Sequence, residues 1–223
     1  MNTKSYRFIY VADPMCSWCW GFSPTFSELL KSHPVPVTVK AGGLRPGAAG
    51  KDLDATMIGH LEHHWKQVAQ ASGQPFKYDL FAWKDWRYDT ELPCMSLLAM
   101  RELDVEDKTA ITTVAWLKLL QQAFYHENID ITDVSVYPEL LKRLDSDLGT
   151  NVVKDSAAFV KRLGEESLKT ETYQEFAEMR QMGVNGFPTL ILDYEEKLYA
   201  LATGFSPLHT IEARLEHHLN QSD

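Results

Sequence analysis

The chain has 223 residues, of which 44% are hydrophobic and 24% are charged. This composition is typical of a folded globular protein and excludes a disordered, collagen-like or coiled-coil chain. Thirty-one acidic against twenty-two basic residues give a formal net charge of -9, which argues against nucleic acid as a partner. No stretch is as long and apolar as a membrane span, and the first residues lack a signal-peptide core, so we expect a cytoplasmic protein with no membrane partner.

The first fifty residues predict a strand, a helix and a second strand. Residues 6–12 read YRFIYVA, an aromatic and β-branched run typical of a buried, central strand. The next segment, 16–31, has apolar residues at helical spacing, although Gly21 and Pro24 should loosen or kink its first turns. Residues 35–44 then predict a strand that ends at a pair of glycines. This order is typical of a βαβ unit.

The middle of the chain, residues 51–164, has helical periodicity and almost no strand-like runs. Asp52 or Asp54 can cap a first helix, which stops near Gly73. A polar aromatic loop follows, and Pro93 is placed to start the next helix. Further helices are predicted around residues 111–124, 140–144 and 159.

Strand patterns return in the last part of the chain. A helix over residues 165–182 should end at Gly183, a favourable residue after a helix. Residues 189–193 and 197–203 predict two strands, and an amphipathic helix begins near Pro207.

The whole pattern predicts an α/β fold with an all-helical insertion between a βαβ half and a ββα half. We expect one domain made of residues 1–50 and 165–223, with residues 51–164 as the inserted helical domain.

Two of the three cysteines form the motif CSWC at the start of the first predicted helix. The odd number and low density of cysteines exclude a scaffold held together by disulfides. A helix N-terminus favours thiolate over thiol at Cys16, and Cys19 lies about one turn away. Because a thiol at that distance can attack a mixed disulfide formed by the first, we predict Cys16 as the nucleophile and Cys19 as the resolving thiol.

Metal binding and plain packing are the alternatives. A zinc site needs two further ligands, whereas only Cys94 and scattered histidines are available, so we predict no metal. His60, His63 and His64 have a spacing that can bind a metal, but a solvated helix face is the favoured interpretation. Inert core cysteines remain an alternative for the pair, and Cys94 reads as a buried free thiol, with a third redox cysteine as the alternative.

Four segments resemble the DsbA-like thiol-disulfide oxidoreductases of the thioredoxin superfamily, and within them the FrnE-like branch. The resemblance spans essentially the whole chain. The segments are DPMCSWCWG at 13–21, GGLRPG at 42–47, WRYDTELPCMS at 86–96 and GVNGFPTL at 183–190.

The resemblance implies a thioredoxin fold in which Pro188 is a cis proline facing the cysteine pair. Phe187 would then offer its backbone to an extended peptide, while Ser17 and Trp18 tune the redox potential and contribute to substrate binding. Many members of the family have proline where this chain has Ser17.

The resemblance also places a buried acid on the first strand, where this chain has Tyr10. Asp13 could substitute for that acid, or it could simply be a turn residue before Pro14.

The predicted function is that of a dithiol-disulfide oxidoreductase acting on protein or peptide thiols, with glutathione as a further candidate partner and no cofactor. One alternative is a glutathione-dependent transferase or isomerase of the kappa type, although such enzymes generally use a single serine or cysteine. The other is a non-catalytic, redox-gated peptide-binding protein, suggested by the tryptophans of the insertion.

Overall fold

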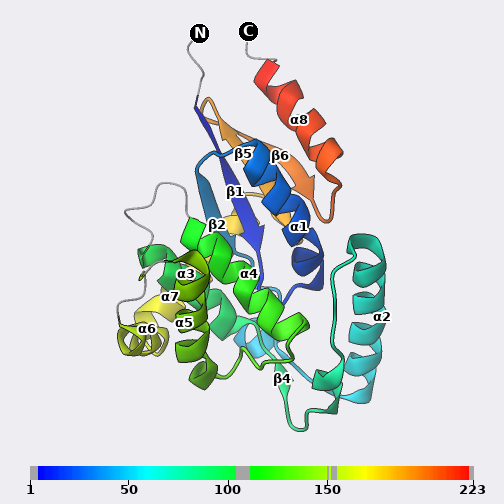
Figure 1. Ribbon diagram of the computed structural model, residues 1–223, viewed down its shortest axis with the longest axis vertical. Coiled ribbons are helices and arrows are strands. Elements are labelled where there is room, and N and C mark those ends of the chain that lie inside the picture. Colours follow the sequence, from blue (N-terminus) through cyan, green and yellow to red (C-terminus); the bar gives the residue numbers. More distant parts are fainter. Residues whose placement is uncertain (1–4, 104–110, 150, 152–154, 221–223) are drawn as a thin grey trace.

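A mixed four-stranded sheet forms the centre of the protein (Figure 1). The computed structural model describes residues 5–103, 111–149, 151 and 155–220. The strands follow the order β2-β1-β5-β6, with β1 parallel to β2 and antiparallel to β5, and β5 antiparallel to β6. Their bounds are Tyr6–Ala12 for β1, Val37–Ala41 for β2, Thr189–Tyr194 for β5 and Lys197–Thr203 for β6. The central position predicted for the first strand is confirmed.

The helices lie close to the positions that the sequence predicts. They are α1 (Ser17–Ser32), α2 (Ala55–Ser72), α3 (Glu91–Leu103), α4 (Ile111–Tyr125), α5 (Tyr137–Leu148), α6 (Ser156–Leu163), α7 (Glu166–Gln181) and α8 (Leu208–Asn220). Single 3-10 turns span Gly47–Ala49, Asp79–Ala82 and Val134–Val136. No helix among the described residues is long and apolar enough to cross a membrane.

Local signals explain the boundaries of α2. The carboxylate of Asp54 accepts a hydrogen bond from the backbone N–H of Met57 at 2.7 Å, so Asp54 is the cap among the two candidates that the sequence offers. At the other end Gly73 has a φ of 73°, which a residue with a side chain rarely adopts.

Helix α1 continues through Pro24, which cannot donate a hydrogen bond to the carbonyl of Trp20. That carbonyl instead accepts hydrogen bonds from Ser23 Oγ at 2.9 Å and from Gln74 Nε2 at 3.1 Å. The side chains therefore satisfy the acceptor that the proline leaves open, and the helix extends unbroken to Ser32.

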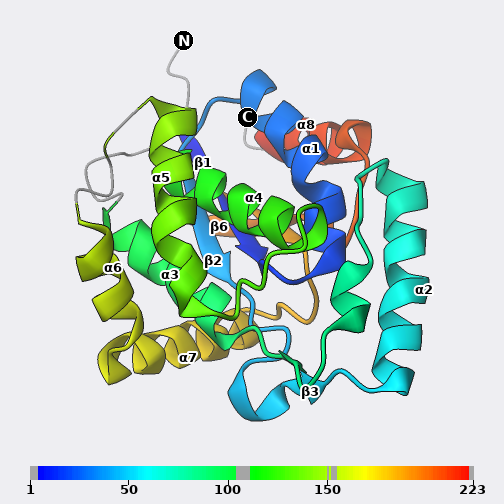
Figure 2. The same ribbon diagram turned by 60° about the horizontal axis from the view of Figure 1, so that its bottom comes forward.

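Alternate residues of β1 pack on opposite faces of the sheet. Tyr10 packs against Phe26 of α1, with ring centroids 4.3 Å apart. Val11 points the other way and packs in a cluster with Met179 of α7. Helices α1 and α7 therefore cover opposite faces, while α8 packs against α1 and β6 (Figure 2).

The inserted segment holds one element that the sequence analysis did not predict. β3 (Lys51–Asp52) and β4 (Arg87–Tyr88) form a small antiparallel sheet, and β4 lies in the predicted loop. The largest cluster of buried side chains joins both parts of the chain, for example Tyr10 of β1 and Trp65 of α2. The division into two domains stays a prediction.

Candidate functional site

The two cysteines of the CSWC motif lie in the first turn of α1. Cys16 is the N-cap residue, and its carbonyl accepts hydrogen bonds from the N–H groups of Cys19 at 2.9 Å and Trp20 at 3.1 Å. Cys16 keeps 6% of its surface exposed, whereas Cys19 is fully buried. Both side chains are free thiols in this structure. The more accessible sulfur is therefore the one at the helix N-terminus.

The segment before β5 approaches Cys16 from the far end of the sequence. Cys16 Sγ lies 3.7 Å from the carbonyl oxygen of Phe187, and the peptide bond between Phe187 and Pro188 is cis. Two hydrogen bonds hold this segment: Thr189 Oγ1 donates to the carbonyl of Gly186 at 2.8 Å, and the N–H of Gly204 donates to the carbonyl of Pro188 at 2.7 Å. The fold therefore brings the Phe187–Pro188 segment against the cysteine pair.

Asp13 lies three residues before Cys16 and is fully buried. Its carboxylate accepts hydrogen bonds from the N–H groups of Met15 at 2.8 Å and Leu44 at 2.7 Å, and from Cys94 Sγ at 3.3 Å. Burial raises the pKa of this carboxyl, and the two N–H groups oppose the rise. Asp13 thus does more than end a strand, because it ties the CSWC loop to the segment after β2 and to α3.

Burial dominates the electrostatics of Cys19. It raises the pKa of this thiol well above the usual range, and the neighbouring Cys16 thiol adds to the rise. Tyr10 lies next to it, and among the described residues its hydroxyl has no hydrogen-bond partner. Burial and then the nearby Cys19 keep the pKa of Tyr10 high, so this hydroxyl stays protonated.

Cys94 is a buried thiol in the first turn of α3, where its N–H donates to the carbonyl of Thr90. Burial raises its pKa well above the usual range, and Asp13 raises it further. It does not line the cavity that Cys16 opens into. Its hydrogen bond to Asp13 gives it a structural contact, as expected for a buried free thiol.

Cys16 opens into a cavity of about 770 Å³. Ser17, Trp18 and Phe187, which the sequence analysis proposed as substrate-binding residues, all line it. Trp18 packs against Phe205, whereas Trp20 is buried in the core, where its Nε1–H donates to the carbonyl of Pro75 at 3.0 Å. The cavity therefore uses only the first of these two tryptophans.

The three histidines of α2 line the same cavity, together with Arg45 from the segment after β2. The sequence analysis treated these histidines as a solvated helix face and assigned no role to Arg45. No group of three or more His, Cys, Asp or Glu side chains in the described part of the chain is arranged to hold a metal ion.

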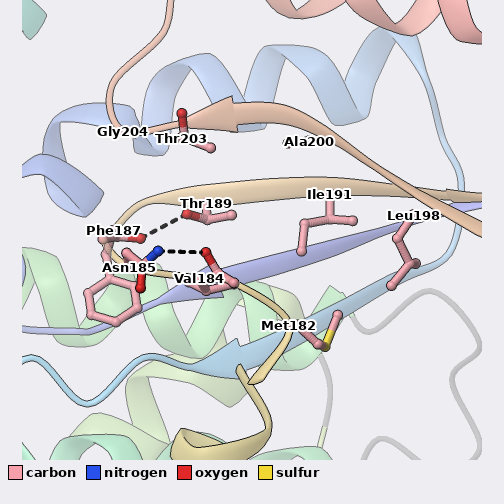
Figure 3. Close-up of a pocket in the computed structure, with 12 residues that line it drawn as sticks. Met182, Val184, Asn185, Phe187, Thr189, Ile191, Leu198, Ala200, Thr203 and Gly204 are labelled. Carbon is pink, nitrogen blue, oxygen red and sulfur yellow. Dashed lines mark hydrogen bonds between the residues drawn. The ribbon is translucent and has the colours of Figure 1, made fainter. Parts of the chain in front are cut away.

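A second cavity, of about 420 Å³, lies beside the same loop (Figure 3). It shares Asn185, Gly186 and Phe187 with the first. Its other walls are mainly apolar and include Ile191 of β5 and Leu198 of β6. The loop before β5 therefore separates a mainly apolar hollow from the cavity that holds Cys16.

A CxxC pair at a helix N-terminus, next to a proline segment that leads into a sheet strand, defines a thioredoxin-like redox protein. The family model of the DSBA-like thioredoxin domain matches residues 9–216, and the chain belongs to this family. This family and the cysteine pair at the start of α1 together support a thiol-disulfide oxidoreductase.

Solved structures of two proteins illustrate a likeness that spans nearly the whole chain. A protein from Nitrosomonas europaea, provisionally assigned as a protein disulfide isomerase, has 27% identity and a TM-score of 0.78, covering 99% of this chain and 100% of its own. The cytosolic disulfide reductase DsbM from Pseudomonas aeruginosa has 26% identity and a TM-score of 0.72, covering 96% and 99%. A structure of DsbM with GSH has 28% identity, a TM-score of 0.70 and the same coverage. A comparison with curated proteins gives no match.

The fold is also shared with an enzyme of the predicted alternative class. A 2-hydroxychromene-2-carboxylate isomerase has 15% identity and a TM-score of 0.62, covering 97% of each chain. At this identity the likeness concerns the fold alone.

Proposed function

We propose that the protein exchanges disulfides with protein or peptide thiols, with Cys16 as the nucleophile and Cys19 as the resolving thiol. The observation that carries this proposal is the difference between the two sulfurs. Cys16 lies at the helix N-terminus on the wall of a cavity, whereas Cys19 is fully buried one turn further on. An external disulfide can reach the first sulfur, and the second can reach only the adduct.

In the reducing direction, the Cys16 thiolate attacks one sulfur of the substrate disulfide. A bond forms between Cys16 and that sulfur, the substrate S–S bond breaks, and one substrate thiolate leaves. The Cys19 thiolate then attacks Cys16 Sγ, which forms the Cys16–Cys19 disulfide and releases the second substrate thiolate. Two electrons pass from the dithiol to the substrate, and the two protons of the dithiol end on the released thiols. Oxidation of a substrate dithiol is the reverse sequence.

Phe187, Pro188, Ser17 and Trp18 would form the surface that receives the substrate beside Cys16. The Phe187 carbonyl lies 3.7 Å from Cys16 Sγ, so an extended peptide beside that sulfur could donate an N–H group to it. Ser17 and Trp18 line the cavity from α1, and Phe187 lines it from the segment before β5.

Glutathione is the small thiol that we propose as a partner. The support comes from the DsbM structure, which is described with GSH. The cytosolic location of DsbM likewise supports our proposal of a cytoplasmic protein, and the FrnE-like branch remains our prediction for its place in the family.

A trapping experiment tests the assignment. The Cys19→Ala protein should accumulate mixed disulfides with a thiol-containing peptide or glutathione, because Cys16 attacks and nothing resolves the adduct. Cys16→Ala should trap no mixed disulfide. Cys94→Ala should reduce insulin at the same rate as the unmodified protein. Equal trapping by Cys16→Ala and Cys19→Ala, or loss of turnover in Cys94→Ala alone, would assign the chemistry to the third cysteine.

A further inference from the structure

The cavity beside Cys16 has a charge opposite to that of the protein as a whole. The chain carries a formal net charge of -9. None of the described residues that line the cavity is Asp or Glu, whereas Arg45, His60, His63 and His64 all line it. A substrate that approaches the redox sulfur therefore meets a cation and three imidazoles, with no carboxylate on the wall to neutralise them.

Arg45 is held in place by its neighbours. Its backbone N–H contacts Thr90 Oγ1 at 3.1 Å, and its carbonyl accepts a hydrogen bond from the N–H of Thr90, also at 3.1 Å. The guanidinium lies over the ring of Tyr88, 5.3 Å from its centroid. The Tyr88 hydroxyl in turn donates to the carbonyl of Met15, the residue before Cys16. The Tyr88 ring under the Arg45 guanidinium is therefore hydrogen-bonded to the loop that carries the reactive sulfur.

No ion pair joins Arg45 to a carboxylate among the residues that the structure describes. Other arginines do have such partners: Arg7, Arg87, Arg101, Arg143 and Arg162 each pair with an Asp or Glu. A guanidinium that is half-buried, stacked on an aromatic ring and left without a carboxylate presents unused N–H donors to the cavity. Its planar fork matches a carboxylate in geometry and charge.

The histidines of α2 line the same cavity as Arg45. His60, His63 and His64 lie at i, i+3 and i+4 on α2, so they share one face of that helix, and all three are exposed. The cavity of about 770 Å³ is within the range of small-molecule sites, large enough for a short peptide and too small for a folded domain.

We propose that this cavity selects a short peptide disulfide that carries free carboxylates, and that Arg45 is the residue that binds a carboxylate. The inference rests on the proposed function, because it needs Cys16 to be the sulfur that attacks. Arg45 has no part in the electron transfer itself. It determines which disulfides react fastest, since a fixed cation favours anionic partners and gives neutral ones no advantage.

The test compares two probes that share one peptide disulfide: oxidised glutathione, whose carboxylates are free, and its tetraethyl ester. The reduced protein is mixed with each probe, quenched with acid, and the growth of the Cys16–Cys19 disulfide is followed by mass spectrometry. We expect the acid probe to react faster with the unmodified protein. We also expect higher ionic strength to slow the acid probe and not the ester, which keeps only its amino groups and gains nothing from a cation on the wall.

Variants of Arg45 then separate binding from structure. Arg45→Gln should slow the acid probe by about tenfold to a hundredfold, the loss expected for one charged hydrogen-bonded contact, and should change the ester rate by less than about twofold. Arg45→Lys keeps the positive charge but not the planar fork of donors. Its rate with the acid probe should therefore lie between those of the unmodified protein and Arg45→Gln. Lys31→Gln is the matched control, because it removes one positive charge at the other end of α1, about 20 Å from Cys16. It should change the rate of neither probe.

Three results would overturn the proposal. The first is that the unmodified protein reacts as fast with the ester as with the acid. The second is that Arg45→Gln slows both probes equally, which would make Arg45 a structural residue. Both of these results leave the dithiol chemistry intact. If neither probe oxidises the unmodified protein, the proposed function fails and the inference fails with it.

Discussion

The ring of Phe187 lies directly over Gly42, the first residue after β2. A methyl group on Gly42 would come within 2.5 Å of Cε1 of that ring. The N–H of Gly42 donates to the carbonyl of Ala12 at 2.8 Å, so the glycine backbone cannot retreat without breaking a hydrogen bond to β1. Because the Phe187 carbonyl faces Cys16, the absence of a side chain at position 42 helps to set the distance between that carbonyl and the sulfur.

Gly42→Ala should therefore lower dithiol turnover without unfolding the protein. The added methyl group must displace the Phe187 ring, and a shift of about 1 Å at a reacting site can reduce the rate by up to about a hundredfold. We expect a loss of about tenfold or more in kcat/KM for insulin reduction, while Cys16 remains open to alkylation.

Gly59→Ala is the matched control for this change. Gly59 lies inside α2 and has open space around it, so a methyl group there meets nothing within 4 Å. Alanine is the better helix former, and the free energy of unfolding should rise by about 0.5–1 kcal/mol. Turnover should be unchanged. Equal activity of the two alanine variants would contradict a positioning role for Gly42.

The order in which the cysteines react with iodoacetamide should follow their exposure. Cys16 lines the cavity of about 770 Å³, whereas Cys19 and Cys94 are fully buried and have raised pKa values. We expect brief treatment of the reduced protein to label Cys16 first, with the other two following only after partial unfolding in urea. Peptide mapping by mass spectrometry measures this order, and early labelling of Cys19 would reverse the assigned roles.

A buried carboxylate at Glu175 joins three elements next to the site. It accepts hydrogen bonds from the N–H of Ala41 in β2 at 2.7 Å, from Lys40 Nζ at 2.9 Å and from both terminal nitrogens of Arg101 in α3. Glu175→Ala leaves these donors without their common acceptor, and removing one partner of a buried ion pair costs about 3–5 kcal/mol. Urea denaturation should show a loss of that size.

Glu178→Ala tests whether the loss of stability expected for Glu175→Ala comes from the burial of that carboxylate. Glu178 lies one turn further along α7, its side chain is 62% exposed, and it approaches Lys40 only to 3.9 Å. Its removal should change the free energy of unfolding by no more than about 0.5 kcal/mol. A comparable loss in both variants would mean that α7 depends on its net charge rather than on the buried network.

The elements that the sequence predicts well are those with local signals. The cap at Asp54, the left-handed glycine at Gly73 and the spacing of apolar residues all act within a few residues of the chain. The turn between β5 and β6 lacks such a signal: Glu195 and Glu196 have φ values of 52° and 59°, which a two-residue hairpin turn requires but which glutamate rarely adopts.

Contacts between distant segments had no such signal. The hydrogen bond from Cys94 to Asp13 spans 81 residues, and the pairing of β3 with β4 joins two strands of two residues each. Arg45 was part of a segment that carried the family resemblance, yet a single arginine gives no local hint of the cavity it lines. The approach of Phe187 to Cys16 was anticipated only through that resemblance, since 171 residues separate them.

The rate at which Cys19 resolves a mixed disulfide should rise with pH. Burial raises the pKa of Cys19 well above its usual range, so the thiol is protonated at neutral pH and the attacking thiolate is a small fraction. Below the pKa that fraction grows about tenfold for each pH unit, and the rate of thiol release should therefore climb from about pH 7 to about pH 9 without reaching a plateau.

The measurement is a single-turnover reaction of the reduced protein with a chromogenic disulfide, in which the first thiol released reports the attack of Cys16 and the second reports the attack of Cys19. Cys19→Ala should release only the first thiol, which identifies the second phase. A second phase that levels off below about pH 8 would show that a neighbouring group removes the proton from Cys19, with Asp13 the nearest buried carboxylate to test, because its charge also acts on that thiol.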